Sequence, residues 1–226
     1  MVISCDPGKK LSDSVIEQLC VANANRKEND FSWYIRQLAD IFQIEECNTI
    51  TEKEKLFFGG FVTGEGSINV SAKKDKGAKF GMVLDPEFSI TQHVNGVSLL
   101  FMAFRLFKTG SLSFKSGSNA TLVYRIDNRN SLNEKVIPFY EKYCSPFWSS
   151  AFQDRLVRFK DLLQFFQEKA HLNLFDFSEK MLVLWDKMRK QKTQSNASFS
   201  TLEEAQTYAK NYRKKGSSSE TTRDFV

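Results

Sequence analysis

The sequence predicts an α+β fold in which helices cover one face of a four-stranded antiparallel sheet. From residue 52 the apolar pattern alternates between helix and strand periodicity, in the order helix, strand, strand, helix, strand, strand, helices. A short polar turn separates the strands of each pair, which is typical of hairpins. Hydrophobic residues make up 41% of the 226 residues, and the 21 Phe among them suffice for a sizeable core.

The first helix of this order opens with a capping box, formed by Thr51 and by Glu54 three residues later. Its interior contains two adjacent glycines, Gly59 and Gly60, although each glycine costs about 1 kcal/mol relative to alanine in a helix. Gly60 and Gly64 are four residues apart and therefore share one side of the helix, with Gly59 beside them. We expect another backbone to approach this strip, most simply that of a second copy of the chain.

Strict alternation predicts the strands, with Ile68, Val70 and Ala72 facing inward in the first of them. Pro86 lies in the inward register of the second strand and indicates a bulge or an edge position. Asn95 is expected to cap the next helix. The later predicted elements are a hairpin within 111–126, helices near 131–143, 153–171 and 177–190, and a last helix capped by Ser200 with Glu203.

We expect three parts: an N-terminal helical extension (1–50) of undefined role, a main domain (51–190), and a polar C-terminal helix with a disordered tail (191–226). Residues 1–50 hold 5 Lys and Arg against 8 Asp and Glu, whereas residues 51–226 hold 27 against 19. A basic body behind an acidic leader favours a polyanionic partner.

The cysteines and histidines are few and scattered, which argues against a zinc site. There are four cysteines without a CxxC pair and two histidines: Cys5, Cys20, Cys47, Cys144, His93 and His171. The sequence has no apolar run of membrane-spanning length and no secretory signal pattern. We therefore expect a soluble intracellular protein with reduced cysteines and no membrane partner, in a bacterial cytoplasm or an organelle matrix, chloroplast or mitochondrial.

The stretch FGGFVTGEG, residues 58–66, resembles the nine-residue LAGLIDADG motif of homing endonucleases. The resemblance covers about residues 51–190 and continues, in order, through four further segments. These are FSITQ (88–92), LFKTGSL (106–112), YRI (124–126) and IPFYEKY (137–143). It implies an αββαββα fold, which agrees with the order of elements above. Because the chain has one motif copy, the resemblance also implies a homodimer acting on a nearly palindromic double-stranded DNA site.

In this family resemblance, Glu65 is the metal-binding acid at the eighth motif position, and the carbonyl of Gly64 lies beside the metal. Gln92 helps to organise water around the attacking nucleophile. The implied reaction is Mg²⁺-dependent hydrolysis of one phosphodiester bond per subunit, with Mn²⁺ as a substitute and short 3′ overhangs as products. By residue type alone, a solvent-exposed acid is an equally good interpretation of Glu65. The expected dimer interface consists of Phe57, Gly60, Phe61 and Gly64.

Two positions depart from the family pattern. Thr63 stands where the motif usually has aspartate, and no lysine follows the IPF segment where the family places a basic residue near the scissile phosphate. Arg155 is the best candidate for that catalytic role, and Arg158 is the second.

The polar face of the sheet is the expected DNA-binding surface. Residue type assigns Lys73, Lys115 and Arg125 to guanine and Asn69 to adenine. In the first hairpin turn, Lys74, Lys76 and Lys79 are expected to hold phosphates. The remaining predicted contacts are Ser71, Glu87, Ser89 and Ser113.

Two other functions fit the same surface. An RNA maturase that assists splicing of its host intron needs the basic surface but not the acid at residue 65. A cleavage-dead DNA-binding protein, such as a repressor, predicts specific binding without cutting in any metal. Loss of Mg²⁺-dependent cutting in Glu65→Gln separates the nuclease from both.

Overall fold

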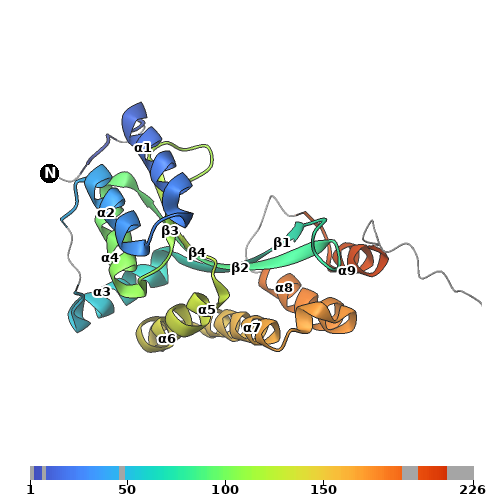
Figure 1. The fold of residues 1–226 in the computed structure, drawn as a ribbon. Coiled ribbons are helices and arrows are strands. Elements are labelled where there is room, and N and C mark those ends of the chain that lie inside the picture. The colour runs from blue at the N-terminus through green and yellow to red at the C-terminus, as the bar shows by residue number, and fades with distance from the viewer. Residues whose placement is uncertain (1–2, 7–8, 46–48, 190–197, 213–226) are drawn as a thin grey trace, which may run out of the picture. The chain divides into compact units, whose positions relative to one another are not determined.

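The computed structural model describes residues 3–6, 9–45, 49–189 and 198–212. From α3 onward its elements follow the predicted order (Figure 1). The helices are α1 (Asp13–Ala24), α2 (Phe31–Phe42), α3 (Glu52–Glu65), α4 (Val97–Phe107), α5 (Arg129–Ser131), α6 (Ile137–Phe139), α7 (Ser150–Gln167), α8 (Leu182–Arg189) and α9 (Leu202–Asn211). The strands are β1 (Gly66–Lys74), β2 (Met82–His93), β3 (Ser111–Phe114) and β4 (Thr121–Ile126). Two π-helical segments, Leu132–Val136 and Tyr140–Cys144, continue α5 and α6.

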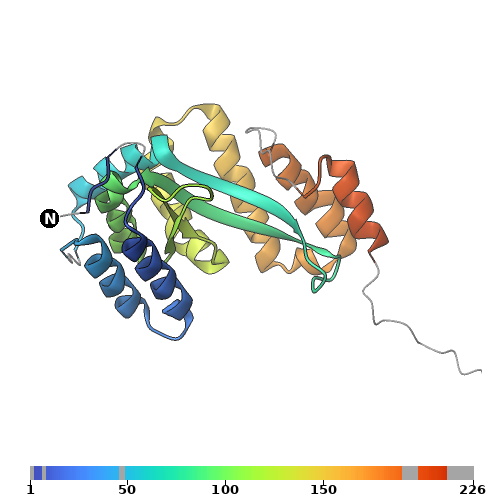
Figure 2. The same cartoon turned by 90° about the horizontal axis from the view of Figure 1, so that it is seen from above.

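The four strands form one sheet in the order β1-β2-β4-β3. β2 pairs with β4 in antiparallel register from Phe88 opposite Ile126 to His93 opposite Thr121, and β4 also pairs with β3. β1 and β2 run side by side as a long hairpin (Figure 2). This is the α+β architecture that the sequence predicts. Pro86 lies outside the β2–β4 ladder, where its missing N–H removes no bond to β4.

The chain divides into two compact units. Unit 1 comprises residues 1–68 and 87–156, and unit 2 comprises residues 69–86 and 157–226. The expected division at residues 50 and 190 concerns functional segments and not compact units, and it stays a prediction.

The core of unit 1 is aromatic and lies between the inward sheet face and the helices α3, α4 and α6. Phe88 of β2 contacts Phe107 of α4 and Tyr140, with ring centroids 5.4 and 5.7 Å apart. Phe107 also meets Phe139 of α6 edge to face at 5.3 Å. Alternate side chains of β2 and β4 are buried here, because they face the same side of the sheet: Phe88, Ile90, Leu122, Tyr124 and Ile126.

The N-terminal helices α1 and α2 close the exposed edge of this sheet at β3. The hydroxyl of Tyr34 accepts a hydrogen bond from the backbone N–H of Leu112, at 2.9 Å, and donates one to Asn23 Oδ1, at 2.8 Å. The side-chain amide of Asn23 donates to the carbonyl of Leu112, at 2.9 Å. Two side chains thus satisfy the backbone groups that an edge strand leaves unpaired. The extension is an integral part of unit 1.

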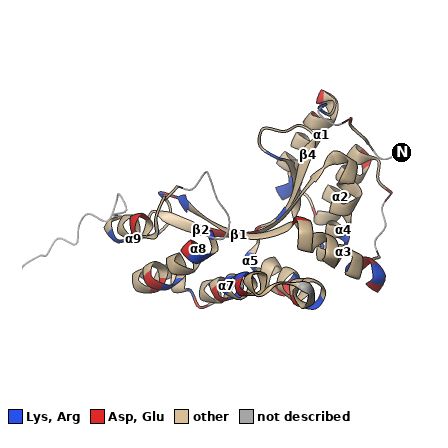
Figure 3. Cartoon of the chain, turned by 180° about the vertical axis from the view of Figure 1, so that it is seen from behind, with Lys and Arg blue, Asp and Glu red and all other residues tan. Residues whose placement is uncertain are grey.

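Unit 2 packs the outer part of the β1–β2 hairpin with the second half of α7, α8 and α9. Its buried side chains include Val70, Leu84, Phe159, Met181 and Trp185. Asp186, also buried, pairs with Arg189, with 2.9 Å between Oδ1 and Nη2, so its charge is compensated. Figure 3 shows both acidic and basic residues on α7; the charged residues of this helix are Asp154, Arg155, Arg158, Lys160 and Asp161.

Two predicted caps are wrong. Asn95 does not cap α4: its side chain accepts from Cys5 N–H at 2.8 Å and donates to the Cys5 carbonyl at 3.0 Å, so it fastens the N-terminal segment instead. α9 is capped by Thr201, which accepts from Glu204 N–H, and not by Ser200 with Glu203. The predicted disordered tail lies mostly beyond residue 212 and outside the described residues.

Candidate functional site

The helix that contains the motif, α3, forms as its sequence predicts. Thr51 accepts from Glu54 N–H at 3.3 Å, and the Glu54 carboxylate accepts from Thr51 N–H at 2.7 Å, which completes the capping box. At the same end, the Glu52 carboxylate pairs with Lys142 at 2.9 Å and accepts from the Tyr143 hydroxyl at 2.8 Å. These hydrogen bonds, first that from Lys142, lower the pKa of Glu52 to about 2.

The glycines of α3 face different neighbours. A Cβ added to Gly59 would lie 2.6 Å from the carbonyl oxygen of Tyr143 and 2.8 Å from its Cβ. Gly59 therefore lets α3 pack against the segment Tyr140–Cys144 of the same chain, which corrects its expected place on the outward strip. Around Gly60 and Gly64, in contrast, no described atom lies within 4 Å of the added Cβ. Their strip is open.

Large apolar side chains border this open strip. Leu56 is 54% exposed and Phe57 is 60% exposed, whereas Phe61 is half-buried and contacts the buried Phe58 at 5.7 Å between ring centroids. Exposed apolar residues beside glycines on one helix face are typical of a protein interface.

The side chains of Thr63 and Cys144 both contact the backbone carbonyl of Gly59. The Thr63 hydroxyl donates to the Gly59 carbonyl at 2.8 Å, and the Cys144 thiol approaches the same oxygen at 3.5 Å. Burial raises the pKa of Cys144 to about 12, so the thiol is neutral and unreactive near pH 7. A threonine at the sixth motif position therefore serves the packing of α3.

Glu65 is the last residue of α3 and is exposed. Among the described residues it has neither an ion pair nor a side-chain hydrogen bond. The chain turns into β1 at Gly66, so the last helical carbonyls, including that of Gly64, lack the N–H groups that a longer helix would provide. A carboxylate and a carbonyl oxygen are hard ligands that suit Mg²⁺.

One chain does not complete such a metal site. The part of the chain that the structure describes contains no group of three or more His, Cys, Asp or Glu able to hold a metal ion. Magnesium is bound in proteins through one or two carboxylates together with waters and substrate phosphates. Glu65 fits this donor set when a second carboxylate, such as Glu65 of a second copy, lies opposite.

Gln92 occupies the end of β2, opposite Leu122, and is half-buried. The β1–β2 hairpin brings the start of β1, which follows Glu65, and the end of β2 to the same end of the sheet. A Cβ on Gly96 would lie 2.8 Å from Gln92 Oε1, so this glycine leaves room for the amide. The structure thus places the predicted acid and the predicted amide at one edge of unit 1.

Arg155 occupies a different place from the one expected. Its side chain is buried, with 5% of the residue exposed, and its Nε donates to the carbonyl of Ile68 at 2.9 Å. The guanidinium ties α7 to β1 three residues after Glu65 and does not face solvent, where a scissile phosphate would bind. Burial raises the pKa of neighbouring Tyr140 well above 10, and the charge of Arg155 opposes this effect. Arg158, the second candidate, is half-buried on α7.

On the polar face of the sheet, several predicted DNA contacts already have partners within the chain. Arg125 pairs with Glu87 at 3.2 Å in unit 1, and Lys73 forms a close ion pair with Asp85 in unit 2. Lys115 is exposed and has no side-chain partner among the described residues. The predicted polar contacts are half-buried in each unit: Asn69, Ser71, Ser89 and Ser113. Direct base contacts by Arg125 and Lys73 would require these ion pairs to open.

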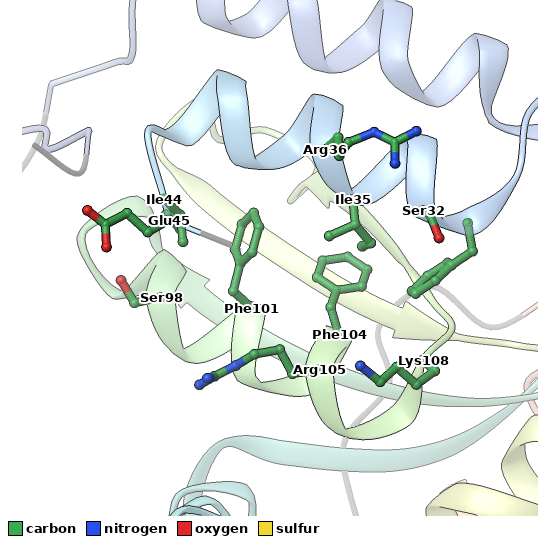
Figure 4. A pocket seen from close by; sticks show the side chains of 11 residues that line it. Ser32, Ile35, Arg36, Ile44, Glu45, Ser98, Phe101, Phe104, Arg105 and Lys108 are labelled. Atoms are coloured by element: carbon green, nitrogen blue, oxygen red, sulfur yellow. The ribbon is translucent and has the colours of Figure 1, made fainter. Parts of the chain in front are cut away.

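A cavity of about 350 Å³ lies elsewhere in unit 1, between α2 and α4 (Figure 4). Apolar side chains such as Ile35, Phe101 and Phe104 form its wall, and Arg36 and Arg105 lie at its rim. Arg105 is engaged with Glu54 at 3.5 Å. None of the predicted site residues lines this cavity.

Within the described ranges, no helix has the length and apolar character needed to cross a membrane.

Comparison with known proteins agrees with this geometry. The sequence profile described as LAGLIDADG endonuclease matches residues 58–163. The DNA endonuclease I-CeuI of Chlamydomonas moewusii is 51% identical over 209 residues, which cover 92% of this chain and 95% of that protein. A probable intron-encoded endonuclease of Neurospora crassa is 28% identical over 123 residues, 54% of this chain and 26% of that protein.

Solved structures show the same fold. I-CeuI complexed with DNA superposes with a TM-score of 0.85 and 49% identity, covering 91% of this chain and 100% of the other. The archaeal intron-encoded enzyme I-Vdi141I, also complexed with DNA, shares the fold at a TM-score of 0.62 and 24% identity, covering 70% of this chain and 96% of the other. With the motif in place at the end of α3 and 51% identity to I-CeuI over 95% of that protein's length, the chain belongs to the LAGLIDADG endonuclease family.

Proposed function

We propose that this chain is a site-specific homing endonuclease that hydrolyses both strands of a long, nearly palindromic double-stranded DNA site. The observation that carries the proposal is the open face of α3, which begins at exposed apolar residues and ends at Glu65, an exposed carboxylate without a described partner. Such a face brings two acids together only when two chains meet. The likeness to I-CeuI, solved in complex with DNA, supports duplex DNA as the substrate.

The proposed dimer forms through α3 of each subunit. Gly60 and Gly64 provide room for a partner backbone, and Phe57 and Phe61 flank that contact. Across a two-fold axis the same strip meets itself, so the two Glu65 carboxylates converge at the ends of the paired helices. Bringing two like charges together is unfavourable without a cation.

We assign Glu65 and the carbonyl of Gly64 to the binding of Mg²⁺, or of Mn²⁺ in its place. When bound, the divalent ion supplies activation of water and stabilisation of the leaving 3′ oxygen. Gln92 orients water at the same end of the sheet. Arg155 holds β1 against α7 next to the acid and acts as a positioning residue, since its burial keeps it from the phosphate.

The polar sheet face is assigned to the major groove of the target. Lys115 can make such a contact without the opening of an ion pair to any described residue. Arg125 and Lys73 exchange their carboxylate partners for DNA acceptors on binding, which favours a specific site over a random one because the exchange requires well-placed acceptors.

The decisive experiment uses a large randomised duplex library incubated with the protein in Mg²⁺, followed by sequencing of all new ends. Glu65→Gln and an EDTA sample are the controls. Enriched ends that share one long, approximately two-fold symmetric site, present only for the unmutated chain with metal, support the proposal. Cutting by Glu65→Gln at the same site would refute the role of the acid. An absence of enriched ends would refute the nuclease and direct the search to structured intron RNA.

Mixing tests whether the site is shared. When unmutated chains and Glu65→Gln chains are refolded together in equal amounts, random pairing leaves about one quarter of the dimers with two acids. A shared site then gives about one quarter of the double-strand cleavage rate. A rate of one half would show that each chain cuts both strands alone.

The compartment, bacterial cytoplasm or organelle matrix, stays a prediction.

A further inference from the structure

The turn between β1 and β2 in unit 2 is tightly ordered by its own backbone. Asp75 N–H donates to the carbonyl of Gly81 at 2.8 Å, and the Asp75 carboxylate accepts from Gly77 N–H at 2.8 Å. Gly81 has φ of +70°, a left-handed conformation that favours glycine. The turn therefore has a defined shape before any ligand binds.

The C-terminal segment after α9 holds this turn from outside. The hydroxyl of Tyr212 donates to the backbone carbonyl of Lys76 at 2.8 Å. The Tyr212 ring lies against Gly81, where an added Cβ would come within 2.2 Å of a ring carbon. One tyrosine thus contacts both sides of the turn, and it lies well beyond residues 58–163, which carry the family profile.

The lysines around the turn differ in what engages them. Lys74 Nζ lies over the rings of Phe199 and Tyr208, 5.2 and 5.3 Å from their centroids. Lys79 Nζ donates to the Leu172 carbonyl at 2.8 Å, and Lys73 pairs with Asp85 as described above. Among the described residues, no group engages the ammonium of Lys76, which is exposed. Of the turn lysines, Lys76 is the one whose ammonium has no partner within the part of the chain that the structure describes.

We propose that Tyr212 is a positioning residue that presents Lys76 to a backbone phosphate of the bound DNA. Tyr212 fixes the backbone of Lys76 itself, so the direction in which this side chain leaves the turn is set before binding. Preorganisation of this kind reduces the entropy lost when a flexible cation is immobilised on a phosphate. The proposal rests on DNA binding, as proposed above, but does not depend on cleavage.

The chain offers a matched pair of substitutions. Tyr212→Phe removes the hydroxyl that donates to Lys76 and keeps the ring against Gly81. Tyr208→Phe removes a hydroxyl for which the described residues provide no partner, and keeps the ring beneath Lys74. Lys76→Ala removes the proposed contact itself. The probe is a mixed-sequence duplex of about 40 base pairs, because phosphate contacts do not require the specific site.

Binding is measured as a function of NaCl concentration. We expect Lys76→Ala to reduce the slope of log affinity against log salt by about 0.9, the value for one phosphate contact on duplex DNA. Tyr212→Phe should weaken binding by about threefold, as expected for one hydrogen bond. In the Tyr212→Phe background, Lys76→Ala should have a smaller effect than in the unmutated chain, whereas in the Tyr208→Phe background its effect should be unchanged.

Hydrogen exchange of the free protein provides a readout that needs no DNA. Tyr212→Phe should speed exchange at the turn amides, residues 75–81, and leave α8 unchanged. Faster exchange without altered coupling to Lys76 would show a purely structural role and overturn the proposal, as would unchanged exchange. Faster exchange that extends to α8 would also overturn it, in favour of a role in folding. Since neither readout uses cleavage, failure of the nuclease proposal remains distinguishable from failure of this one.

Discussion

The two adjacent glycines of α3 should respond oppositely to substitution by alanine. In either position alanine favours the helix by about 1 kcal/mol relative to glycine. At Gly59 the new methyl group would lie 2.6 Å from a carbonyl oxygen of Tyr143 and 2.8 Å from its Cβ, so backbone must move. Overpacking of this kind costs about 1–3 kcal/mol. Gly59→Ala should therefore lower the free energy of unfolding by about 0–2 kcal/mol.

At Gly60 no atom of the described residues lies within 4 Å of the added methyl group, so only the helix preference remains. Gly60→Ala should stabilise the isolated chain by about 1 kcal/mol. The difference between the two variants, about 1–3 kcal/mol, isolates the packing term because the helix preference cancels. The measurement is urea unfolding at a protein concentration low enough to keep the chain monomeric.

The same two variants separate the proposed dimer contact from the chain interior. By sedimentation equilibrium, Gly60→Ala should weaken self-association at least tenfold, about 1.4 kcal/mol, because its methyl group enters the interface strip. Gly59→Ala should leave self-association nearly unchanged once the chain is folded. The reasoning is refuted if Gly59→Ala stabilises the monomer as much as Gly60→Ala does, or if Gly60→Ala leaves the dimer intact.

Three further predictions concern unit 1. Tyr34→Phe leaves the N–H of Leu112 without its acceptor, and urea unfolding should show a loss of about 1–3 kcal/mol. At pH 8, iodoacetamide followed by mass spectrometry should label the exposed Cys20 within minutes and Cys144 only on unfolding; early labelling of Cys144 contradicts its burial. The lowered pKa of Glu52 implies a stabilisation that is present above pH 4.5 and is lost as the pH falls through about 2. Glu52→Gln should flatten this acid limb of the unfolding midpoint against pH, and an unchanged limb would assign it to other carboxylates.

Where a local rule decides the structure, the sequence was sufficient. The capping box at Thr51 needs only residues three positions apart, and the inward face of β1 needs only alternation, so both predictions are confirmed. At two residues with distant partners, Asn95 and Arg155, the structure differs from what residue type alone suggests. Asn95 is a good cap by type, but it binds Cys5, ninety residues away along the chain. Arg155 is a plausible phosphate ligand by residue type, but in the structure its guanidinium donates a hydrogen bond to the carbonyl of Ile68.

The sequence also left residues 1–50 without a role, for the same reason. Nothing in the pattern of α2 distinguishes Tyr34 from an ordinary core tyrosine, because its partner is the backbone of β3, seventy-eight residues later. Without α1 and α2, the four-residue edge strand β3 would leave the backbone groups of its outer side unpaired, which makes a poor edge for a DNA-binding sheet. The acidic extension is better suited to this edge than to DNA, and its place against β3 leaves the polar face of the sheet to the basic part of the chain.

Gly59 and Gly60 face different neighbours, which explains why the motif contains two glycines in succession. Residues adjacent on a helix lie about 100° apart, so a pair of them addresses two different neighbours at once. One glycine admits Tyr143 of the same chain and fixes the direction in which α3 leaves the core. The other belongs to the open strip of Gly60 and Gly64, which the proposed dimer uses. Since α3 ends at Glu65, the first contact orients the acid, and in the proposed dimer the second contact supplies the partner's acid, so neither glycine can replace the other.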